Sequence, residues 1–466
     1  MTKIHSLLWS ACVLALLISC EKDDLKKEKQ QRLHVNEFIA EAMDYYYLWN
    51  DQIPNIRPDN STDPNEYFKS LLYKDDIWSY ITDDKDTFME EEINQTGETF
   101  GYELSFGLFN NSSNVFAVVR YVYPLSPAAA VLKRGDIILK LNDQSLTVDN
   151  YTDLYKSGTI RLTLGTISGS TLAPANSVTL SSVKMERNPV FLSKTIEQGG
   201  HKIGYLVYTS FASHYHQSLV DTLTALKTGG ITDLVLDLRY NSGGEADEAA
   251  LLCSAIVPSA YANKDNILIR HRWNAQRQAD LEELVKEEPA AYEKLLFTTF
   301  ETVACNLELP SRRVYVLTTS SSASASEMLI VGLKPYMDVI QVGDTTHGKY
   351  TAMIGLAPTE AAINHWMILP VVYKFMNKDG YTDFKDGLAP DHLLEEALPF
   401  RELGDEAEPL LAKAISLITG NVDHEEDDLE SVAPGREIRW LPLPAKRVLD
   451  GQLLHRLPGD ARFPGR

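Results

Sequence analysis

The sequence predicts an α/β fold in which parallel strands alternate with helices. Two stretches carry this prediction, because each runs from a short apolar strand through a turn of small residues into a helical pattern. In the first, a strand at 234–239 leads to the turn 241–244 (Asn-Ser-Gly-Gly) and a helix that begins near Asp247. In the second, a strand at 314–317 leads to a serine-rich turn and a helix from Ser326. Because ligands bind at the carboxyl ends of such strands, we expect both turns at one functional edge.

The composition describes a globular protein with room for two or three domains. The chain has 466 residues, of which 44% are hydrophobic and 9% aromatic. The formal net charge of −21 argues against a nucleic-acid partner, because phosphate binding depends on clustered basic residues. Histidines and cysteines lack the spacing of metal ligands, and no cofactor is expected.

The first residues have the pattern of an export signal. An apolar run from Leu7 to Leu17 is too short to cross a bilayer as a stable helix, and it is followed by Cys20 and then by charged residues. This pattern resembles a bacterial lipoprotein signal that is cleaved before Cys20, which then carries the lipid. An ordinary signal anchor with an incidental cysteine is the alternative. The expected location is the bacterial cell envelope, lipid-anchored at the outer membrane, either periplasmic or surface-exposed.

The pattern along the sequence divides it into six segments. Residues 1–19 are the signal and 20–32 a charged tether. Residues 33–98 are a small N-terminal helical cap, because apolar residues recur there at helical spacing. Residues 99–187 change to strand-like patterning, and 188–420 contain the α/β core. The last segment, 421–466, is acidic and then rich in Arg and Pro, which predicts a loosely ordered tail.

The strand-rich segment resembles a PDZ domain of the circularly permuted bacterial kind. The resemblance rests on Ser-Pro-Ala-Ala at 126–129 and Arg-Gly-Asp-Ile-Ile at 134–138. In such domains a peptide adds as an extra strand, and backbone N–H groups of a loop capture its terminal carboxylate. By this resemblance the loop contains Phe100, Gly101 and Tyr102, where Gly101 lets the backbone approach the peptide closely. A PDZ shell that has lost ligand binding is the alternative.

Four motifs resemble, in the same order, those of the carboxy-terminal processing peptidases, also called tail-specific proteases. They are Asp-Leu-Arg at 237–239 with Asn-Ser-Gly-Gly at 241–244, Ser-Ala-Ser-Ala-Ser-Glu at 322–327, Val342-Gly343 followed by Gly348-Lys349, and Gly-Leu-Ala-Pro-Asp at 387–391. With the PDZ-like segment, the resemblance covers most of residues 100 to 420. It implies a ClpP/crotonase-like βαβ catalytic core preceded by the PDZ-like β domain, and a serine peptidase with a Ser/Lys dyad.

The resemblance also implies the roles of individual residues. Ser324, the middle serine of its run, is the nucleophile, and Lys349 is the base that removes its proton. A lysine can do so only when unprotonated, so its reference pKa of about 10.4 must fall by roughly three units, through burial in an apolar site. Ala325 then supplies one oxyanion N–H group, and Gly243 or Gly244 the other.

Two positions depart from the family pattern. Many members carry Gln four residues after the lysine, where this sequence has Met353, and a thioether is only a weak acceptor. Lys349 is therefore held by other groups, or held less firmly. His347 replaces a common Phe, which opens an alternative in which His347 is the base of a Ser-His system with Asp344. A solvent-facing loop residue is the simpler interpretation of His347.

The expected function is that of an endopeptidase. It would cleave extracytoplasmic proteins or peptides through an acyl-enzyme on Ser324, while the PDZ-like domain receives the C-terminus of the substrate. A catalytically inactive peptide- or ligand-binding lipoprotein on the same fold is one alternative, favoured by Met353. A nutrient-processing enzyme that acts on peptides or amides from outside is another. The sequence leaves the oligomeric state open.

Outside the predicted signal the sequence has two cysteines, Cys253 and Cys305. A disulfide between them is possible outside the cytoplasm. We favour two buried free thiols, because the spacing matches no disulfide motif.

Overall fold

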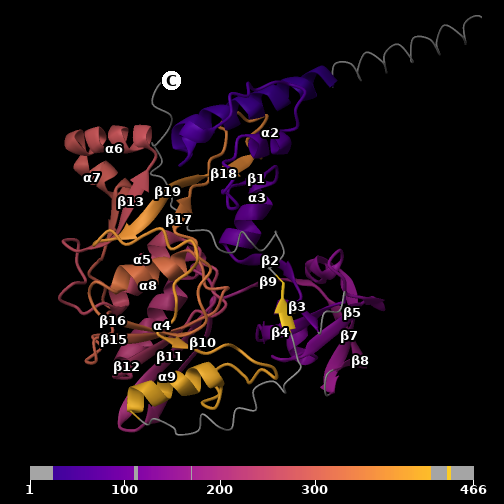
Figure 1. Cartoon of the computed structure of the whole chain (residues 1–466), viewed down its shortest axis with the longest axis vertical. Coiled ribbons are helices and arrows are strands. Elements are labelled where there is room, and N and C mark those ends of the chain that lie inside the picture. Colours follow the sequence, from indigo (N-terminus) through magenta and orange to yellow (C-terminus); the bar gives the residue numbers. More distant parts are fainter. Residues whose placement is uncertain (1–24, 110–113, 169–170, 421–437, 442–466) are drawn as a thin grey trace, which may run out of the picture.

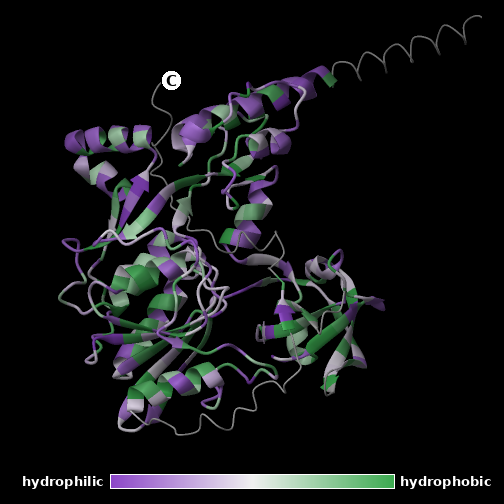
Figure 2. Ribbon diagram, viewed as in Figure 1, coloured by the Kyte–Doolittle hydropathy of each residue, from purple (hydrophilic) through white to green (hydrophobic). Residues whose placement is uncertain are grey.

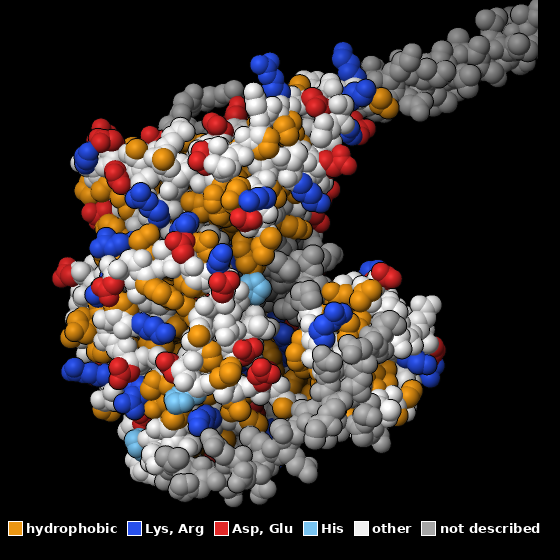
Figure 3. Space-filling view, viewed as in Figure 1, with side chains coloured by type: hydrophobic (Ala, Val, Ile, Leu, Met, Phe, Trp, Pro, Cys, Tyr) orange, Lys and Arg blue, Asp and Glu red, His pale blue; other side chains and the backbone are white. Residues whose placement is uncertain are grey.

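The computed structural model describes residues 25–109, 114–168, 171–420 and 438–441. They form an N-terminal helical region, a larger α/β domain, and a separate β-rich lobe built from strands β3 to β8, which we call the β lobe (Figure 1). On the face seen in Figure 3, an indentation separates the helical region from the β lobe. Among the residues with described positions, none of the helices combines the length and hydrophobicity that a bilayer crossing requires. The predicted signal and Cys20 lie outside the described residues.

The N-terminal region is helical, as its apolar spacing predicts. Residues 25–46 are helical, and the face that contains Val35, Ile39 and Met43 is buried. The shorter helices that follow are η1 (Asn50–Gln52), α2 (Pro64–Ser70), α3 (Lys85–Phe88) and η2 (Met89–Ile93). Residues 25–32, which we predicted as part of a tether, belong to the first helix instead. Strand β1 (Tyr80–Thr82) pairs with β18 (Met367–Leu369), which joins this region to the α/β domain.

The β lobe is an antiparallel sheet with its own apolar core. Its strands are β3 (Tyr102–Phe109), β4 (Val115–Val122), β5 (Ile137–Leu141), β6 (Gln144–Ser145), β7 (Thr159–Ser168) and β8 (Thr171–Ser181), with the short helices η3 (Ala128–Ala130) and η4 (Tyr151–Tyr155). The flanking strands β2 (Thr96–Thr99) and β9 (Val183–Glu186) pair with each other. Both connections to the neighbouring segments therefore run through one two-stranded ribbon.

One strand of the β-lobe sheet comes from the far end of the sequence. Strand β21 (Ile438–Trp440) pairs antiparallel with β3, and it is the yellow arrow beside the β3 label in Figure 1. The prediction of a loosely ordered tail is therefore wrong for residues 438–441. The segment is too short for sequence periodicity to reveal a strand, and its order comes from the sheet edge that it meets.

The α/β domain is built on a sheet with the order β10-β11-β12-β15-β16-β20. These strands are β10 (Val190–Gln198), β11 (His201–Tyr208), β12 (Asp233–Asp237), β15 (Arg313–Thr318), β16 (Asp338–Gly343) and β20 (His392–Leu393). Strands β11 to β20 run parallel, and β10 is antiparallel to β11. All residues of β12 are buried, which explains why it forms a continuous apolar run in the sequence.

Helices cover both faces of this sheet. Helices α4 (His216–Thr228), α5 (Ala246–Ile256) and α8 (Ala325–Leu333), with η5 (Ser213–Tyr215) before α4, lie on the side of Leu236. Helix α9 (Pro409–Thr419) packs on the side of Val235. Since neighbouring residues of a strand point to opposite faces, these are the two sides of one sheet. The α/β architecture that the sequence predicts is confirmed.

A second, antiparallel sheet with the order β14-β13-β19-β17 packs beside α8. Its strands are β13 (Ile267–Trp273), β14 (Phe297–Thr299), β17 (Thr351–Met353) and β19 (Val371–Asn377), and α6 (Ala275–Glu287), α7 (Pro289–Tyr292) and η6 (Glu293–Leu295) follow β13. Figure 2 shows hydrophobic residues concentrated in the main sheet, whereas α6 on the outside is mostly hydrophilic. Cys253 and Cys305 are buried free thiols, so our preferred interpretation of these cysteines is confirmed.

Candidate active site

Ser324 lies where β15 gives way to α8. It is the N-cap residue of α8, it is fully buried, and its backbone has φ +58° and ψ −107°. A residue with a side chain adopts a positive φ only when the surrounding structure holds it there, and such residues cluster at functional sites. Among the described residues, Ser324 Oγ is a buried hydroxyl oxygen with no hydrogen-bond partner. The turn therefore presents one strained serine whose hydroxyl faces the N–H of Glu327 in the capping box of α8 and has no described acceptor for its own proton.

The glycine turn after β12 meets the serine turn, as their shared sheet edge predicts. Strands β12 and β15 are parallel neighbours, so both end on the same side. A Cβ atom at Gly243 would lie 2.9 Å from the Cβ of Ser324 and 3.2 Å from the backbone nitrogen of Ala325. Only glycine lets the two turns approach this closely, and the φ of +119° at Gly243 requires glycine as well.

The two glycines that we considered as oxyanion donors have different surroundings. The N–H of Gly243 donates to Asn241 Oδ1 at 2.8 Å. Gly244 lies against the backbone of Phe211, where an added Cβ would be 2.3 Å from the carbonyl oxygen. Gly243 is therefore the glycine in contact with the serine turn. Ala325 is the first residue of α8, where backbone N–H groups have no acceptor within the helix.

Lys349 is fully buried on the loop that follows β16. Its Nζ lies 3.6 Å from the Sδ of Met353 and 4.9 Å from the centre of the Trp78 ring. Burial lowers the pKa of Lys349 from 10.5 to about 7, although the charges of Asp76 and Glu327 oppose this shift. Much of the amine is therefore neutral near pH 7, which is the state that a general base needs.

Glu327 ties the serine turn to the lysine loop. Its buried carboxylate accepts hydrogen bonds from the backbone N–H groups of Ser324 at 2.7 Å, Gly348 at 2.6 Å and Lys349 at 2.9 Å. It also accepts one from the Thr346 hydroxyl at 2.6 Å. Our sequence reasoning missed this residue, although a Glu three residues after a serine N-cap is a known helix-start signal.

The residues around Lys349 include two from the N-terminal region that the sequence did not single out. Trp78 covers the amine with its ring face, and Asp76 is a buried carboxylate that accepts a hydrogen bond from Tyr47 at 2.7 Å. Both lie just before β1, far from Lys349 in sequence. The helical region therefore completes the site, and no local pattern could have indicated it.

The alternative base, His347, is exposed, and its described hydrogen bond is with Ser320 and not with Ser324. Its Nδ1 lies 3.2 Å from the carbonyl oxygen of Ser320, and its ring packs edge-on against Trp78 at 5.0 Å. The described hydrogen bond of the Asp344 carboxylate comes from the N–H of Thr345. The described bonds of His347 and Asp344 therefore do not assemble a Ser-His-Asp arrangement.

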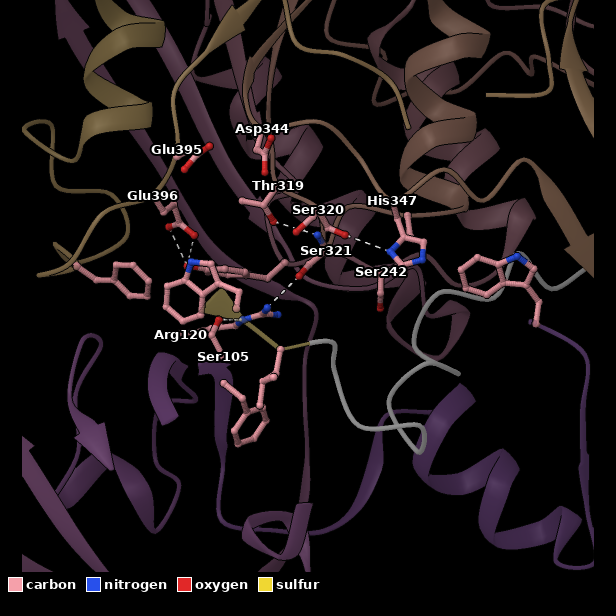
Figure 4. Close-up of a pocket in the computed structure, with 17 residues that line it drawn as sticks. Ser105, Arg120, Ser242, Thr319, Ser320, Ser321, Asp344, His347, Glu395 and Glu396 are labelled. Carbon is pink, nitrogen blue, oxygen red and sulfur yellow. Dashed lines mark hydrogen bonds between the residues drawn. The ribbon is translucent and has the colours of Figure 1, made fainter. Parts of the chain in front are cut away.

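A cavity of about 400 Å³ lies between the α/β domain and the β lobe, and Ala323, which precedes Ser324, is one of the residues that line it. Figure 4 shows Arg120 and Ser105 of the β lobe next to each other, with Arg120 reaching Ser321 of the α/β domain and His347 farther to the right. Arg120 donates to Ser321 Oγ at 2.9 Å and to Ser105 Oγ at 2.6 Å. The cavity has the size of a ligand site, and both domains line it.

Buried ion pairs join the β lobe to the α/β domain. Arg239 is fully buried and contacts Asp237, Glu408 and Glu396. Arg134 of the β lobe contacts the same Glu396 at 2.7 Å. Breaking one member of such a network leaves a charge buried without a partner, which typically costs about 3–5 kcal/mol. The network therefore fixes one wall of the cavity.

Comparison with known proteins identifies the class. The family model of peptidase family S41 matches residues 202–394, and that of the S41 N-terminal domain matches residues 34–80. The carboxyl-terminal-processing protease of Synechocystis sp. is 23% identical over 350 residues, which cover 73% of this chain and 74% of that protein. The carboxy-terminal processing protease CtpB of Bacillus subtilis is 27% identical over 268 residues, 56% of this chain and 48% of that protein.

A solved structure agrees with these matches. The crystal structure of an S41 protease from Bacteroides fragilis NCTC 9343 has a TM-score of 0.66 and 26% sequence identity, and it covers 83% of this chain and 97% of that one. The chain belongs to peptidase family S41. It is therefore a serine-type peptidase, and the family resemblance that the four motifs predict is confirmed.

Proposed function

We propose that this peptidase is an endopeptidase that works through Ser324 and Lys349. The observation that carries the proposal is the burial of Lys349, which lowers its pKa to about 7 on a loop that Glu327 connects to the turn of Ser324. Lys349 removes the proton of Ser324 Oγ as this oxygen attacks the peptide carbonyl. The protonated amine then gives that proton to the departing amine, and an acyl-enzyme remains. Water, deprotonated by Lys349, hydrolyses the ester.

The oxyanion of each step is stabilised at the start of α8. We assign one donor to the N–H of Ala325 and the second to the N–H of Gly243, which lies against Ser324. In the described state the N–H of Gly243 donates to Asn241 Oδ1, so it serves the oxyanion by sharing or exchanging that bond. Such a donor typically contributes about 3–4 kcal/mol to the transition state.

We also propose that the β lobe is a PDZ-type module that receives the C-terminus of an extracytoplasmic protein or peptide. Phe100 and Gly101 of the proposed loop precede β3, which begins at Tyr102, and the side chains of Phe100 and Tyr102 are buried in the lobe core. A peptide would therefore bind through the backbone of this loop, where the N–H of Gly101 donates to Thr99 Oγ1 at 3.1 Å and would exchange that bond for the peptide carboxylate. A Cβ at Gly101 would lie 2.1 Å from Ser126 Cβ, so this position requires glycine.

Labelling with a fluorophosphonate probe tests the nucleophile and the base. Wild type and Ser259→Ala, a change at an exposed serine, are expected to label equally. Ser324→Ala should lose the label, Lys349→Ala should lose most of it, and His347→Ala should retain it. Full labelling of Ser324→Ala would refute the assignment, and absence of labelling in wild type would favour the non-catalytic binder.

The lipid anchor at Cys20 remains a proposal that rests on the sequence pattern. Metabolic labelling with a palmitate analogue in a bacterial host should mark the wild-type protein and not Cys20→Ser. Membrane fractionation of the same two proteins then tests the proposed location at the outer membrane. Equal labelling of both proteins would refute the anchor.

A further inference from the structure

Residues 438–441 occupy the edge of the β-lobe sheet. Ile438, Arg439 and Trp440 pair with Phe109, Leu108 and Gly107 of β3, and the N–H of Leu441 donates to the carbonyl of Phe106 at 2.8 Å. The sheet order runs β21-β3-β4-β5-β7-β8. Strand β3 would therefore be an open edge without this segment, and an open edge is where an extended peptide can add.

The side chains of the segment alternate between the two faces of the sheet. Leu441 packs on the apolar core of the lobe, in the cluster that contains Phe106 and Tyr155. On the other face, Ile438 joins the cluster of Phe116, and the ring of Trp440 lies 6.0 Å from the Phe116 ring. The groove thus accepts a strand that carries an aliphatic residue at the position of Leu441.

The segment runs along β3 in the direction that is expected of a peptide ligand. Its residue numbers rise as those of β3 fall, so it runs toward the start of β3 and the loop of Gly101. A peptide whose C-terminus is captured by that loop would run in the same direction along β3. The segment therefore lies on the same strand edge as the proposed substrate, along the half of β3 that is farther from the Gly101 loop.

Two of the same residues form part of the wall of the cavity beside the serine turn. Trp440 and Leu441 line it together with Ala323, which precedes the nucleophile, and with His347. Ser324 and Lys349 are fully buried in this state. The segment thus lies on the approach that joins the β-lobe edge to the serine turn.

We propose that residues 438–441 are an intramolecular peptide ligand of the β lobe, which a substrate must displace before cleavage. This inference rests on the proposed role of the β lobe in peptide binding. The segment is short and lightly packed: Trp440 is 42% exposed and Arg439 is exposed as well. A peptide whose side chain fills the apolar groove better than Leu441 does can therefore displace the segment.

The first experiment measures binding of a fluorescein-labelled peptide with the sequence of residues 436–441 and a free C-terminus. Leu441→Asp in the full-length protein should release the segment, because a carboxylate is expelled from the apolar groove. If the segment fills about nine-tenths of the grooves in the wild type, only about one-tenth are open to the peptide, and the apparent Kd is about tenfold higher than the intrinsic Kd. Release of the segment should therefore lower the apparent Kd about tenfold. Val148→Asp, at an exposed position of the same lobe, is the matched control and should bind as wild type does. Equal affinity of wild type and Leu441→Asp would overturn the proposal.

The second experiment locks the segment in place. Ile438 and Phe109 are direct ladder partners, and paired Cα atoms of antiparallel strands lie about 4.5–5.5 Å apart, within disulfide range. Oxidised Phe109→Cys/Ile438→Cys should lose peptide binding at least tenfold and lose peptidase activity, and a thiol reductant should restore both. Full binding by the oxidised form would overturn the proposal.

Fluorophosphonate labelling separates this proposal from the proposed function. If Leu441→Asp binds the peptide more tightly but no variant labels at Ser324, the dyad assignment fails and the intramolecular ligand stands. If Ser324 labels normally but the peptide binds wild type and Leu441→Asp equally, the intramolecular ligand fails and the dyad stands.

Discussion

The substitution Lys349→Met is expected to stabilise the protein while it abolishes catalysis. Burial lowers the pKa of Lys349 from 10.5 to about 7. At about 1.4 kcal/mol per unit, protonated Lys349 opposes folding by roughly 5 kcal/mol. Methionine has a similar length and no charge, and its new neighbours would be Met353 and Trp78. The variant therefore removes the penalty without leaving a large cavity.

The sign and the pH window of this effect follow from the two pKa values. Below about pH 7 the amine is protonated in the folded and unfolded states, so the folded state carries the full penalty. Between about pH 7 and pH 10.5 only the unfolded state is protonated, so the free energy of unfolding of the wild type rises with pH. The stabilisation by Lys349→Met should thus be roughly 5 kcal/mol at pH 6, roughly 3 at pH 8.5 and near zero at pH 10.5.

Urea unfolding at these three pH values, followed by circular dichroism, measures the difference. Lys202→Met is the control, because Lys202 is partly exposed and its Nζ lies 3.7 Å from Glu197. That change should alter stability by less than about 1 kcal/mol at each pH. A stabilisation by Lys349→Met that does not vary with pH, or a destabilisation at pH 6, would refute the reasoning. The proposed assignment of the base would then lose its electrostatic support.

Three further predictions concern the neighbours of the proposed dyad. Glu327→Gln replaces one acceptor oxygen by an NH₂ group that faces backbone donors. The free energy of unfolding, measured with urea, should therefore fall by roughly 2–4 kcal/mol. Unchanged stability would contradict the hydrogen bonds described for Glu327. Gly243→Ala places a Cβ 2.9 Å from that of Ser324 and should lower kcat at least about 100-fold. Gly158→Ala, also at positive φ but with nothing within 4 Å, should leave kcat unchanged, and equal losses in the two variants would exclude the contact as the cause. Trp78→Ala opens the lysine site to water, which raises the pKa of Lys349 from about 7. The midpoint of the pH–activity profile should therefore move upward. An unmoved midpoint would show that the ring does not exclude solvent.

Several individual strands and helices could be predicted because they have local causes. The apolar run of β12 and the helical spacing after Val35 each reflect burial on a known period. The predicted tether and the predicted loosely ordered tail are the two segments in which the structure differs from the prediction. Residues 25–32 are helical because charged residues with good helix propensity continue the helix that follows, and β21 is ordered by an edge that lies more than 300 residues away in sequence.

Residue types and their spacing are sufficient to predict the α/β class, the family and the two strand-to-helix turns, and they single out Ser324 and Lys349. These features depend on residue type and short spacing, which are present before any folding takes place. The environment of the Lys349 amine, in contrast, follows from the packing of distant segments. The pKa of Lys349 depends on burial and on the charges of Asp76 and Glu327. The Trp78 ring and Met353 lie against the amine, and Asp76 and Trp78 reach it only because the N-terminal region packs against the loop. Electrostatic environment is a property of the assembled interior, so no spacing along the sequence encodes it.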